Sequence, residues 1–225
     1  MHKFIICIGV PRTATSFLYQ LFRDCTDCSY AKIKETNYFL DLKGTKKSYE
    51  KLFERRSEVF FECSPAYFSS MESLIKIKHE LVNPEIIFCS RNIKERFISQ
   101  YKHHYEIINK KYPNFNEYCA DAFVNSNDWF HPNYNLRCSN YKKILSDLLE
   151  VFPIDKVHHL SQDELKNNPD KWVSRVENIS QVKFKKWKQK NKTNHTKPTK
   201  EIFEFTEELN KELESYESDF HNYTY

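Results

Sequence analysis

The chain has 225 residues, of which 40% are hydrophobic and 16% are aromatic, so it can form one sizeable core. Its 35 lysines and arginines against 31 aspartates and glutamates leave a net charge of only +4, which excludes a surface that binds nucleic acid along a whole face. The sequence predicts no membrane span, because no apolar stretch approaches the necessary length.

The first chemical signal along the chain is a strand, a tight loop and a helix. The apolar run over residues 4–8 predicts a strand buried on both faces, and Gly9 and Pro11 mark the loop after it. Apolar residues at helical spacing then follow three cap-type residues, Thr13, Thr15 and Ser16. A helix that begins after such a loop presents unpaired N–H groups and the positive end of its dipole, which together bind phosphate.

The loop departs from the phosphate loop of nucleoside triphosphatases, G-x-x-x-x-G-K-[ST]. Gly9 and Ser16 fit that pattern, but Ala14 replaces its second glycine and Thr15 replaces its lysine. A nucleoside triphosphatase is therefore disfavoured. A buried strand that turns into an ordinary helix is the simpler alternative at this point.

What remains is G-x-P-R-T-x-T-S, which resembles the 5′-phosphosulfate loop of sulfotransferases that use 3′-phosphoadenosine 5′-phosphosulfate. Ala14 departs from the glycine that the family carries. The resemblance implies that the loop binds the donor nucleotide and that Arg12 also takes part in catalysis. The implied donor-binding residues here are Pro11, Arg12, Thr13, Ala14, Thr15 and Ser16.

Residues 29–33 predict a short second strand, which ends beside Lys34 and Glu35. In an open α/β sheet the carboxyl ends of the strands carry the ligands. The segment Lys34-Glu35-x-x-Tyr38-Phe39 is similar to the Lys-Glu-x-x-Phe-Phe segment of heparan-sulfate-type and related bacterial sulfotransferases. That resemblance implies that Glu35 is the catalytic base and that Lys34 contacts the acceptor. A solvated surface ion pair is the alternative.

Residues 59–62 predict a third buried strand, and the six residues after it resemble the family's Lys-Ser/Thr-Pro-Ala-Tyr-Phe segment. Cys63 stands where the family has lysine, so Glu62 or Lys34 is expected to matter more. The resemblance implies an acceptor-side role for Glu62, Tyr67 and Phe68. Plain core packing of the two aromatic residues is the alternative.

A helix is predicted over residues 69–82 and a fourth strand over residues 85–90. The stretch that follows resembles the family's Arg-Asp-Pro-x-x-Arg-x-x-Ser-x-Tyr segment, with Arg91 and Ser99 at the matching positions. These two residues are implied to bind the 3′-phosphate. A guanidinium at the end of a strand suits a phosphate, and Ser99 lies about two helical turns further on.

Residues 102–137 are rich in histidine and aromatic residues, His103 among them. They predict either an acceptor-binding wall or a surface loop with core aromatics. A helix over 141–152, a fifth strand over 156–160 and a short helix from 161 come next. Residues 183–197 form a basic loop, in which the resemblance implies that Lys190, Lys192 and Asn194 contact the nucleotide. A C-terminal helix is predicted over about 199–216.

These patterns together predict a single α/β domain over residues 1–225, with a central, mostly parallel sheet flanked by helices. The resemblance implies a P-loop-like sulfotransferase that moves a sulfuryl group from 3′-phosphoadenosine 5′-phosphosulfate to a hydroxyl, or less favourably an amine. The acceptor would be a glycan or a small molecule, and the product nucleotide adenosine 3′,5′-bisphosphate. A small-molecule kinase and a non-catalytic nucleotide-binding relative remain the alternatives.

Seven cysteines without paired metal-type motifs predict reduced thiols and no metal site. The apolar run after Lys3 is too short for a secretion signal. We therefore expect a cytoplasmic protein.

Overall fold

The computed structural model describes residues 2–41, 46–107, 112, 114–185, 187 and 203–221. The chain forms two compact units. Unit 1 comprises Met1–Ser90 and Ile144–Asn191, and unit 2 comprises Arg91–Lys143 and Lys192–Tyr225. Each unit is described by itself.

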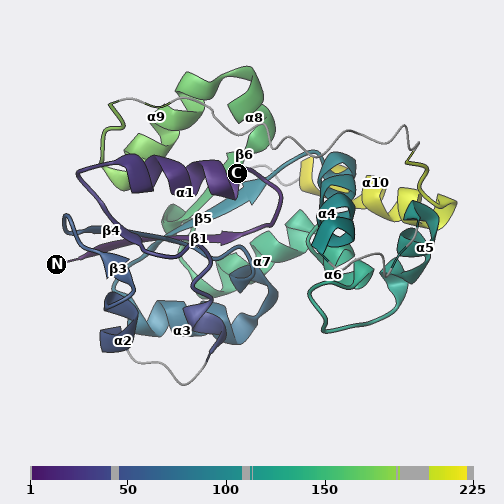
Figure 1. Cartoon of the computed structure of the whole chain (residues 1–225), viewed down its shortest axis with the longest axis horizontal. Helices are drawn as coiled ribbons and strands as arrows, with labels where there is room; N and C mark the ends of the chain where they lie inside the picture. Colours follow the sequence, from purple (N-terminus) through teal and green to yellow (C-terminus); the bar gives the residue numbers. More distant parts are fainter. Residues whose placement is uncertain are drawn as a thin grey trace. The chain divides into compact units, whose positions relative to one another are not determined.

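Unit 1 is built on a sheet whose described strands run in the order β3-β2-β4-β1-β5-β6 (Figure 1). Neighbouring strands are parallel except β2 and β3, which pair antiparallel at one edge. The strands are β1 (Lys3–Gly9), β2 (Ser29–Ala31), β3 (Phe53–Glu54), β4 (Val59–Cys63), β5 (Glu85–Ser90) and β6 (Val157–Ser161). The predicted fold class, a mostly parallel sheet flanked by helices, is confirmed.

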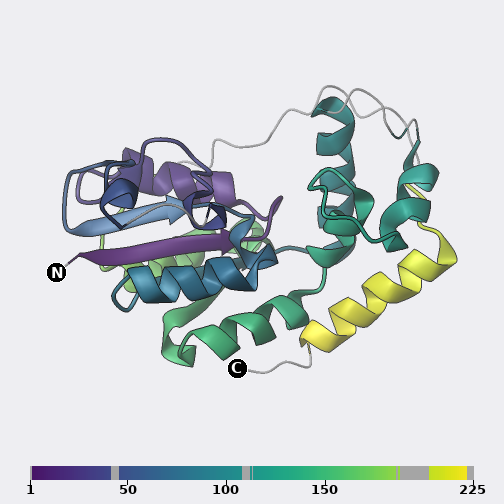
Figure 2. The same cartoon turned by 90° about the horizontal axis from the view of Figure 1, so that it is seen from below.

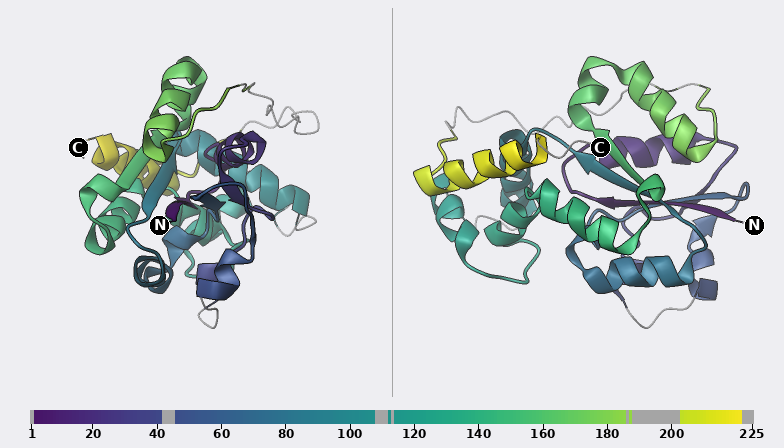
Figure 3. Two further views of the ribbon diagram at one scale, coloured as in Figure 1. Left: turned by 90° about the vertical axis from the view of Figure 1, so that its left-hand side faces the viewer. Right: turned by 180° about the vertical axis from the view of Figure 1, so that it is seen from behind.

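Helices α1 (Thr15–Asp24), α8 (Gln162–Asn167) and α9 (Pro169–Ser180) lie on one face of the sheet (Figures 1 and 3). The rings of Phe22 on α1 and Phe61 on β4 stack with centroids 3.9 Å apart. Burial of such aromatic pairs explains why the apolar stripe of α1 faces the sheet.

The opposite face is covered by α2 (Lys46–Glu50) and α3 (Met71–Glu80), together with α7 (Tyr141–Val151) from Ile144 onward (Figure 2). Tyr49 on α2 packs against Phe4 of β1, with ring centroids 6.0 Å apart. Because helices cover both faces, the central strands read as continuous apolar runs instead of alternating ones. The described part of the unit also holds three short 3₁₀ helices, η1 (Tyr38–Leu40), η2 (Tyr67–Ser69) and η4 (Ile154–Lys156).

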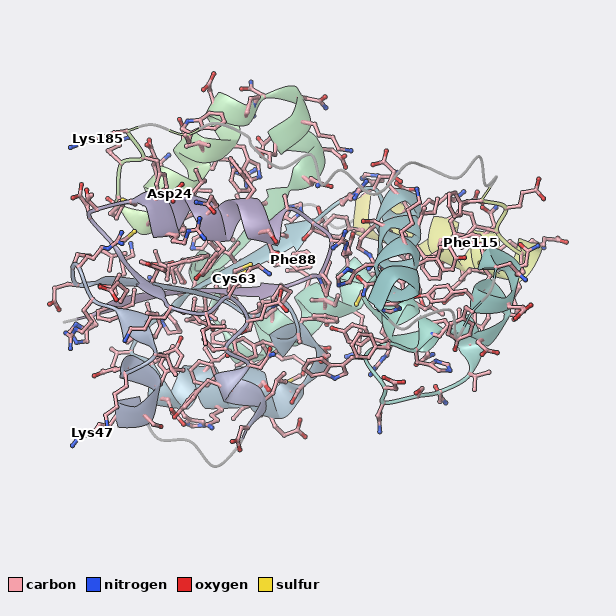
Figure 4. The ribbon with its side chains drawn as sticks, in the orientation of Figure 1. Asp24, Lys47, Cys63, Phe88, Phe115 and Lys185 are labelled. Carbon is pink, nitrogen blue, oxygen red and sulfur yellow. The ribbon has the colours of Figure 1, made fainter. Side chains whose placement is uncertain are left out.

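Unit 2 is helical in its described residues. Its elements are α4 (Ile93–Ile107), α5 (Phe115–Ala120), η3 (Asp121–Phe123), α6 (Pro132–Arg137), the start of α7 and α10 (Glu207–His221). Phe115 lies among the aromatic side chains of this unit (Figure 4), and its ring contacts those of Phe97, Tyr101 and Phe203. This aromatic cluster gives the unit its own core.

Several boundaries differ from those that the sequence predicts: α3 is shorter than the predicted 69–82, β2 ends two residues before the predicted 33, and β3 is not among the predicted strands. Helix α10 begins at Glu207, later than the predicted residue 199, because the Thr206 hydroxyl accepts the N–H of Leu209 at 3.4 Å and caps the first turn. Strand β3 has only two residues, and no strand pattern of that length can be read from a sequence. Of the predicted basic loop, residues 183–185 and 187 are described.

Candidate functional site

The loop after β1 is held by its own hydrogen bonds and by its neighbours. The N–H of Val10 donates to the carbonyl oxygen of Cys89 at 3.2 Å, which ties the loop to β5. The buried hydroxyl of Thr13 donates to the carbonyl oxygen of Val10 at 2.6 Å. Arg12 and Ala14 both take left-handed backbone angles, with φ of 70° and 69°. The loop is therefore a fixed turn, and the side chain of Thr13 supports it from within.

Helix α1 presents its N-terminus at the end of this loop. Its cap residue is Ala14, whose side chain makes no cap hydrogen bond, and no acidic residue lies in its first turn. Thr15 is buried and Ser16 is exposed. The N–H of Phe17 already donates to the carbonyl oxygen of Ala14 at 2.9 Å. This helix end therefore presents the N–H groups ahead of Phe17 and the positive end of the dipole, and anion binding here stays a prediction.

Gly9 marks a close approach of two backbone segments. A Cβ atom at Gly9, which has a φ of 135°, would lie 2.5 Å from the carbonyl oxygen of Pro65. Only glycine fits such a position. The loop after β1 and the segment after β4 are therefore packed together at the carboxyl edge of the sheet.

The segment after β2 places Glu35 at this same edge. The N–H of Glu35 donates to the carbonyl oxygen of Cys63 at 3.0 Å, at the end of β4. Glu35 is exposed and has a φ of 66°, and its carboxylate pairs with the ammonium of Lys34. Strand β4 lies between β2 and β1, and Cys63 at its end pairs in register with Cys7 of β1, so Glu35 and the loop after β1 lie on either side of the end of β4.

Lys34 is a half-buried cation at this edge. Burial acts to lower its pKa, but the nearby Cys63 thiol and the Glu35 carboxylate outweigh that effect, so its pKa is raised. Lys34 therefore stays charged beside Glu35. The thiol of Cys63 donates to the carbonyl oxygen of Thr15 at 3.7 Å, and burial raises its pKa well above the ordinary value.

Glu62 is fully buried beneath the segment that carries Glu35. Its Oε1 atom accepts hydrogen bonds from the hydroxyls of Thr36, at 3.0 Å, and Ser64. Burial raises the pKa of Glu62 to about 7, although these hydrogen bonds act to lower it. The structure thus places Glu62 away from solvent.

The aromatic pair after β4 belongs to the core. Tyr67 is fully buried and Phe68 is 6% exposed. The hydroxyl of Tyr67 accepts the N–H of Phe39 at 3.3 Å, and the ring of Phe68 would be 3.0 Å from a Cβ at Gly9. Both side chains therefore pack in the core beneath the carboxyl edge of the sheet.

In unit 2, Arg91 directly follows β5, and Ser99 lies on α4. The guanidinium of Arg91 donates through Nε and Nη2 to Glu95, at 3.2 and 3.0 Å. Its backbone is clamped by Tyr141, whose hydroxyl accepts the N–H of Arg91 at 3.2 Å and donates to its carbonyl oxygen at 2.8 Å. Ser99 is 9% exposed, and His103 lies one turn further along α4, half-buried. Lys190, Lys192 and Asn194 lie outside the described residues.

Two features of this edge could not be found from sequence motifs. One is the set of hydroxyls around Glu62. The other is His159 on β6, whose Nε2 lies 2.7 Å from the hydroxyl of Ser90 at the end of β5. Burial, together with the charge of Arg175, lowers the pKa of His159 to about 4, so its ring is neutral near pH 7. Both features depend on contacts between segments that are far apart in the sequence, so no local sequence pattern predicts them.

The family model for a sulfotransferase domain matches residues 2–220. This chain belongs to the sulfotransferase domain family. No curated protein sequence matches it.

Known sulfotransferase structures share the fold. The sulfotransferase from Alicyclobacillus acidocaldarius superposes with a TM-score of 0.74 at 16% identity, over 97% of this chain and 93% of that one. A mouse sulfotransferase complexed with PAP gives a TM-score of 0.53 at 11% identity, over 99% of this chain and 85% of that one. The sulfotransferase domain from the curacin biosynthetic pathway gives 0.56 at 11% identity, over 82% and 75%.

Three further observations concern the described residues of this sulfotransferase. None of its helices there combines the length and apolar character needed to cross a membrane. Within the same residues, no three histidine, cysteine or acidic side chains gather as a metal site would require. All seven cysteines are buried and free.

Proposed function

We propose that this sulfotransferase moves a sulfuryl group from 3′-phosphoadenosine 5′-phosphosulfate to a hydroxyl of a glycan or small-molecule acceptor. The observation that carries the proposal is that the N-terminus of a helix and an exposed carboxylate lie on either side of the end of β4. The loop after β1 leads into α1, and Glu35 is hydrogen-bonded to the end of β4. An acceptor placed between them would face both a held phosphate and a base.

The residues of the loop fit the donor nucleotide. The N–H groups at the start of α1 would bind its 5′-phosphate, and Arg12 would add a planar fork of donors that stays charged at any working pH. The left-handed backbone at Ala14 turns the chain so that the helix begins directly after the loop. PAP in the mouse relative supports the same nucleotide here. Arg91 and Ser99 are proposed to bind its 3′-phosphate.

The reaction balances with the residues described. The acceptor oxygen forms a bond to sulfur while the bond from sulfur to the phosphate oxygen breaks, and the acceptor proton passes to Glu35. Arg12 and the loop N–H groups stabilise the negative charge that develops on the departing phosphate oxygen. Positioning in line and charge stabilisation supply most of the catalysis, as they do in phosphoryl transfer.

Roles on the acceptor side are proposed for residues of each unit taken by itself. In unit 1, Lys34 is a charged contact beside Glu35, while Glu62, Tyr67 and Phe68 act from beneath the edge. In unit 2, His103 and the exposed rings of Trp129 and Phe130 offer stacking and hydrogen bonding of the kind that sugars use. We also propose a cytoplasmic location, which the seven free cysteines support.

The proposal is tested by transfer of labelled sulfate from the donor to a panel of glycans and phenols. We expect at least one acceptor to become labelled, with release of adenosine 3′,5′-bisphosphate. Phosphate transfer from ATP and Mg²⁺ in a parallel assay would instead identify a kinase. Nucleotide binding without transfer to any acceptor would identify a non-catalytic relative.

A further inference from the structure

Three consecutive backbone N–H groups in the segment that carries Glu35 donate to side-chain hydroxyls. The pairs are Asn37 with Ser64 at 3.0 Å, Tyr38 with Thr36 at 3.3 Å and Phe39 with Tyr67 at 3.3 Å. Two of these hydroxyls come from the segment after β4, since Ser64 lies 27 residues after Asn37 and Tyr67 lies 28 residues after Phe39. Residues 37–39 are therefore held by side chains instead of by a strand or a long helix.

The direction of these hydrogen bonds is fixed by the number of hydrogens available. Each hydroxyl carries one hydrogen and can accept through its lone pairs. Ser64 and Thr36 both direct that hydrogen to Oε1 of Glu62. Because the hydrogen of Thr36 is used in this way, the hydroxyl of Tyr67, 3.3 Å from Thr36 Oγ1, is the donor in their contact. All three hydroxyls thus lead to one carboxylate.

The burial of Glu62 makes its protonation state important for the hydrogen bonds that it accepts. The side chain is 0% exposed, and in the described part of the chain its Oε2 atom has no hydrogen-bond partner. The titratable groups that face it are Tyr49 from α2, Tyr67 from η2 and Cys63 from β4, all of which are neutral near pH 7 because burial raises their pKa values. Burial favours the neutral form, whereas hydrogen bonds from Ser64, Thr36 and Tyr67 favour the ionised form.

We propose that Glu62 is a positioning residue, whose ionised carboxylate receives this relay of hydrogen bonds and thereby holds residues 36–39, and with them Glu35, in the conformation that the reaction needs. The inference rests on the proposed function for the role of Glu35. Hydrogen bonds to a carboxylate are roughly twice as strong as those to a neutral acceptor. Protonation of Glu62 therefore weakens the relay and loosens the segment, although Glu62 itself does not touch the acceptor.

The relay is tested first by amide hydrogen exchange, which requires no turnover. In the wild type we expect the protection factors of residues 37–39 to rise roughly tenfold between about pH 6 and about pH 8, on either side of the Glu62 pKa. Glu62→Gln keeps an oxygen acceptor but cannot ionise, so its protection should not change over this range. Equal rises in the wild type and Glu62→Gln would overturn the proposal, as would a flat wild type.

A second pair of variants covers the case in which Glu62→Gln does not fold. Thr36→Ser retains the hydroxyl and should keep the rise in protection with pH. Thr36→Val has the same shape as threonine but no donor, so it should lose most of that rise. If Thr36→Val behaves like Thr36→Ser, the hydroxyl has no part in holding the segment and the relay is refuted.

The pH dependence of turnover separates this inference from the proposed function. Once an acceptor that the enzyme sulfates is identified, kcat of the wild type should rise through about pH 7. The Glu62→Gln variant should lack that rise in kcat but keep the wild-type KM for the nucleotide. If the protection shift occurs but no acceptor is sulfated, the relay stands and the proposed function fails. If sulfation occurs and kcat follows the same pH curve in both proteins, the proposed function stands and the positioning role of Glu62 fails.

Discussion

The backbone N–H of Glu35 donates to the carbonyl oxygen of Cys63 over 3.0 Å. This bond joins the segment after β2 to the end of β4, so the backbone of Glu35 is tied to the sheet. The carboxylate itself stays exposed, where an acceptor can reach it. A rigid backbone with an accessible side chain is what a general base requires.

The first prediction concerns Glu35 as the base. Glu35→Gln removes the proton acceptor but keeps the shape of the side chain, so turnover should fall by roughly 10²–10⁴. Nucleotide affinity should be nearly unchanged, and Glu58→Gln, on another exposed carboxylate, should behave as the wild type. Steady-state kinetics and calorimetry together give both quantities. Full activity of Glu35→Gln would move the base to another group, such as His103.

The second prediction concerns recognition of the 3′-phosphate by unit 2. Arg91→Ala should weaken binding of adenosine 3′,5′-bisphosphate by about 1.5–3 kcal/mol, the range for hydrogen bonds to charged groups, and leave AMP binding unchanged. Glu95 occupies two donors of Arg91, so Glu95→Gln should tighten bisphosphate binding. Calorimetry on these variants, with Lys142→Ala as a control on an exposed ion pair, measures the effect. Equal affinity of the wild type for AMP and the bisphosphate would remove the assignment.

The third prediction concerns Arg12. If its guanidinium stabilises the departing phosphate oxygen, Arg12→Ala should lose most of the turnover and Arg12→Lys should retain a measurable part of it. Nucleotide binding should weaken only modestly in both variants, because the loop N–H groups carry much of the phosphate contact. Single-turnover assays separate chemistry from binding. Unchanged chemistry in Arg12→Ala would assign the charge to Lys34 or to the basic segment 183–197.

The fourth prediction concerns stability and the Glu62 carboxyl. Its pKa is about 7 in the folded protein against an ordinary 4.5, so the unfolded chain releases this proton first as the pH rises. The free energy of unfolding should therefore fall between about pH 4.5 and about pH 7, by roughly 3 kcal/mol, because one pKa unit corresponds to about 1.4 kcal/mol.

Denaturant unfolding of the wild type and Glu62→Gln across this pH range measures that contribution. The difference in unfolding free energy between the two proteins should change with pH in the stated direction. A constant difference would show that Glu62 titrates at its ordinary value. Under the proposed relay, the pH that gives faster turnover is also the pH at which the fold is less stable.

The sequence predicts the sheet well and the site in part. The apolar runs at 4–8, 59–62, 85–90 and 156–160 correspond to β1, β4, β5 and β6, because strands buried on both faces leave an unbroken apolar pattern. The loop after β1 and the position of Glu35 at the strand edge also follow from local patterns. The relay to Glu62 does not, because Thr36 and Ser64 are brought together only by the pairing of β2 with β4. The pairing of Arg91 with Glu95 is likewise one of several choices open to an arginine that precedes a helix.

The fifth prediction concerns Ala14, which has a φ of 69° at the start of α1. A left-handed conformation costs an alanine roughly 1–2 kcal/mol, whereas glycine adopts it freely. Ala14→Gly should therefore leave the free energy of unfolding unchanged or raise it by up to about 1 kcal/mol. Ala120→Gly, at an ordinary φ of −61°, should lower it by about 0.5–1 kcal/mol. Thermal unfolding of the two variants compares them, and equal losses would show that Ala14 bears no strain.

The chain has only two glycines, and among its described residues six that are not glycine take a positive φ, Arg12, Ala14, Glu35, Asn37, Asn83 and Gln181. At these turns the folded chain carries steric strain, which is largely an enthalpy cost. A glycine there would carry no such strain, but it would lose more conformational entropy on folding. In the free energy of folding the entropy difference is multiplied by temperature, whereas the enthalpy of strain is not. Substitution by glycine at these turns should therefore become less favourable on warming, so the scarcity of glycine around the loop after β1 and around Glu35 helps most when the protein is warm.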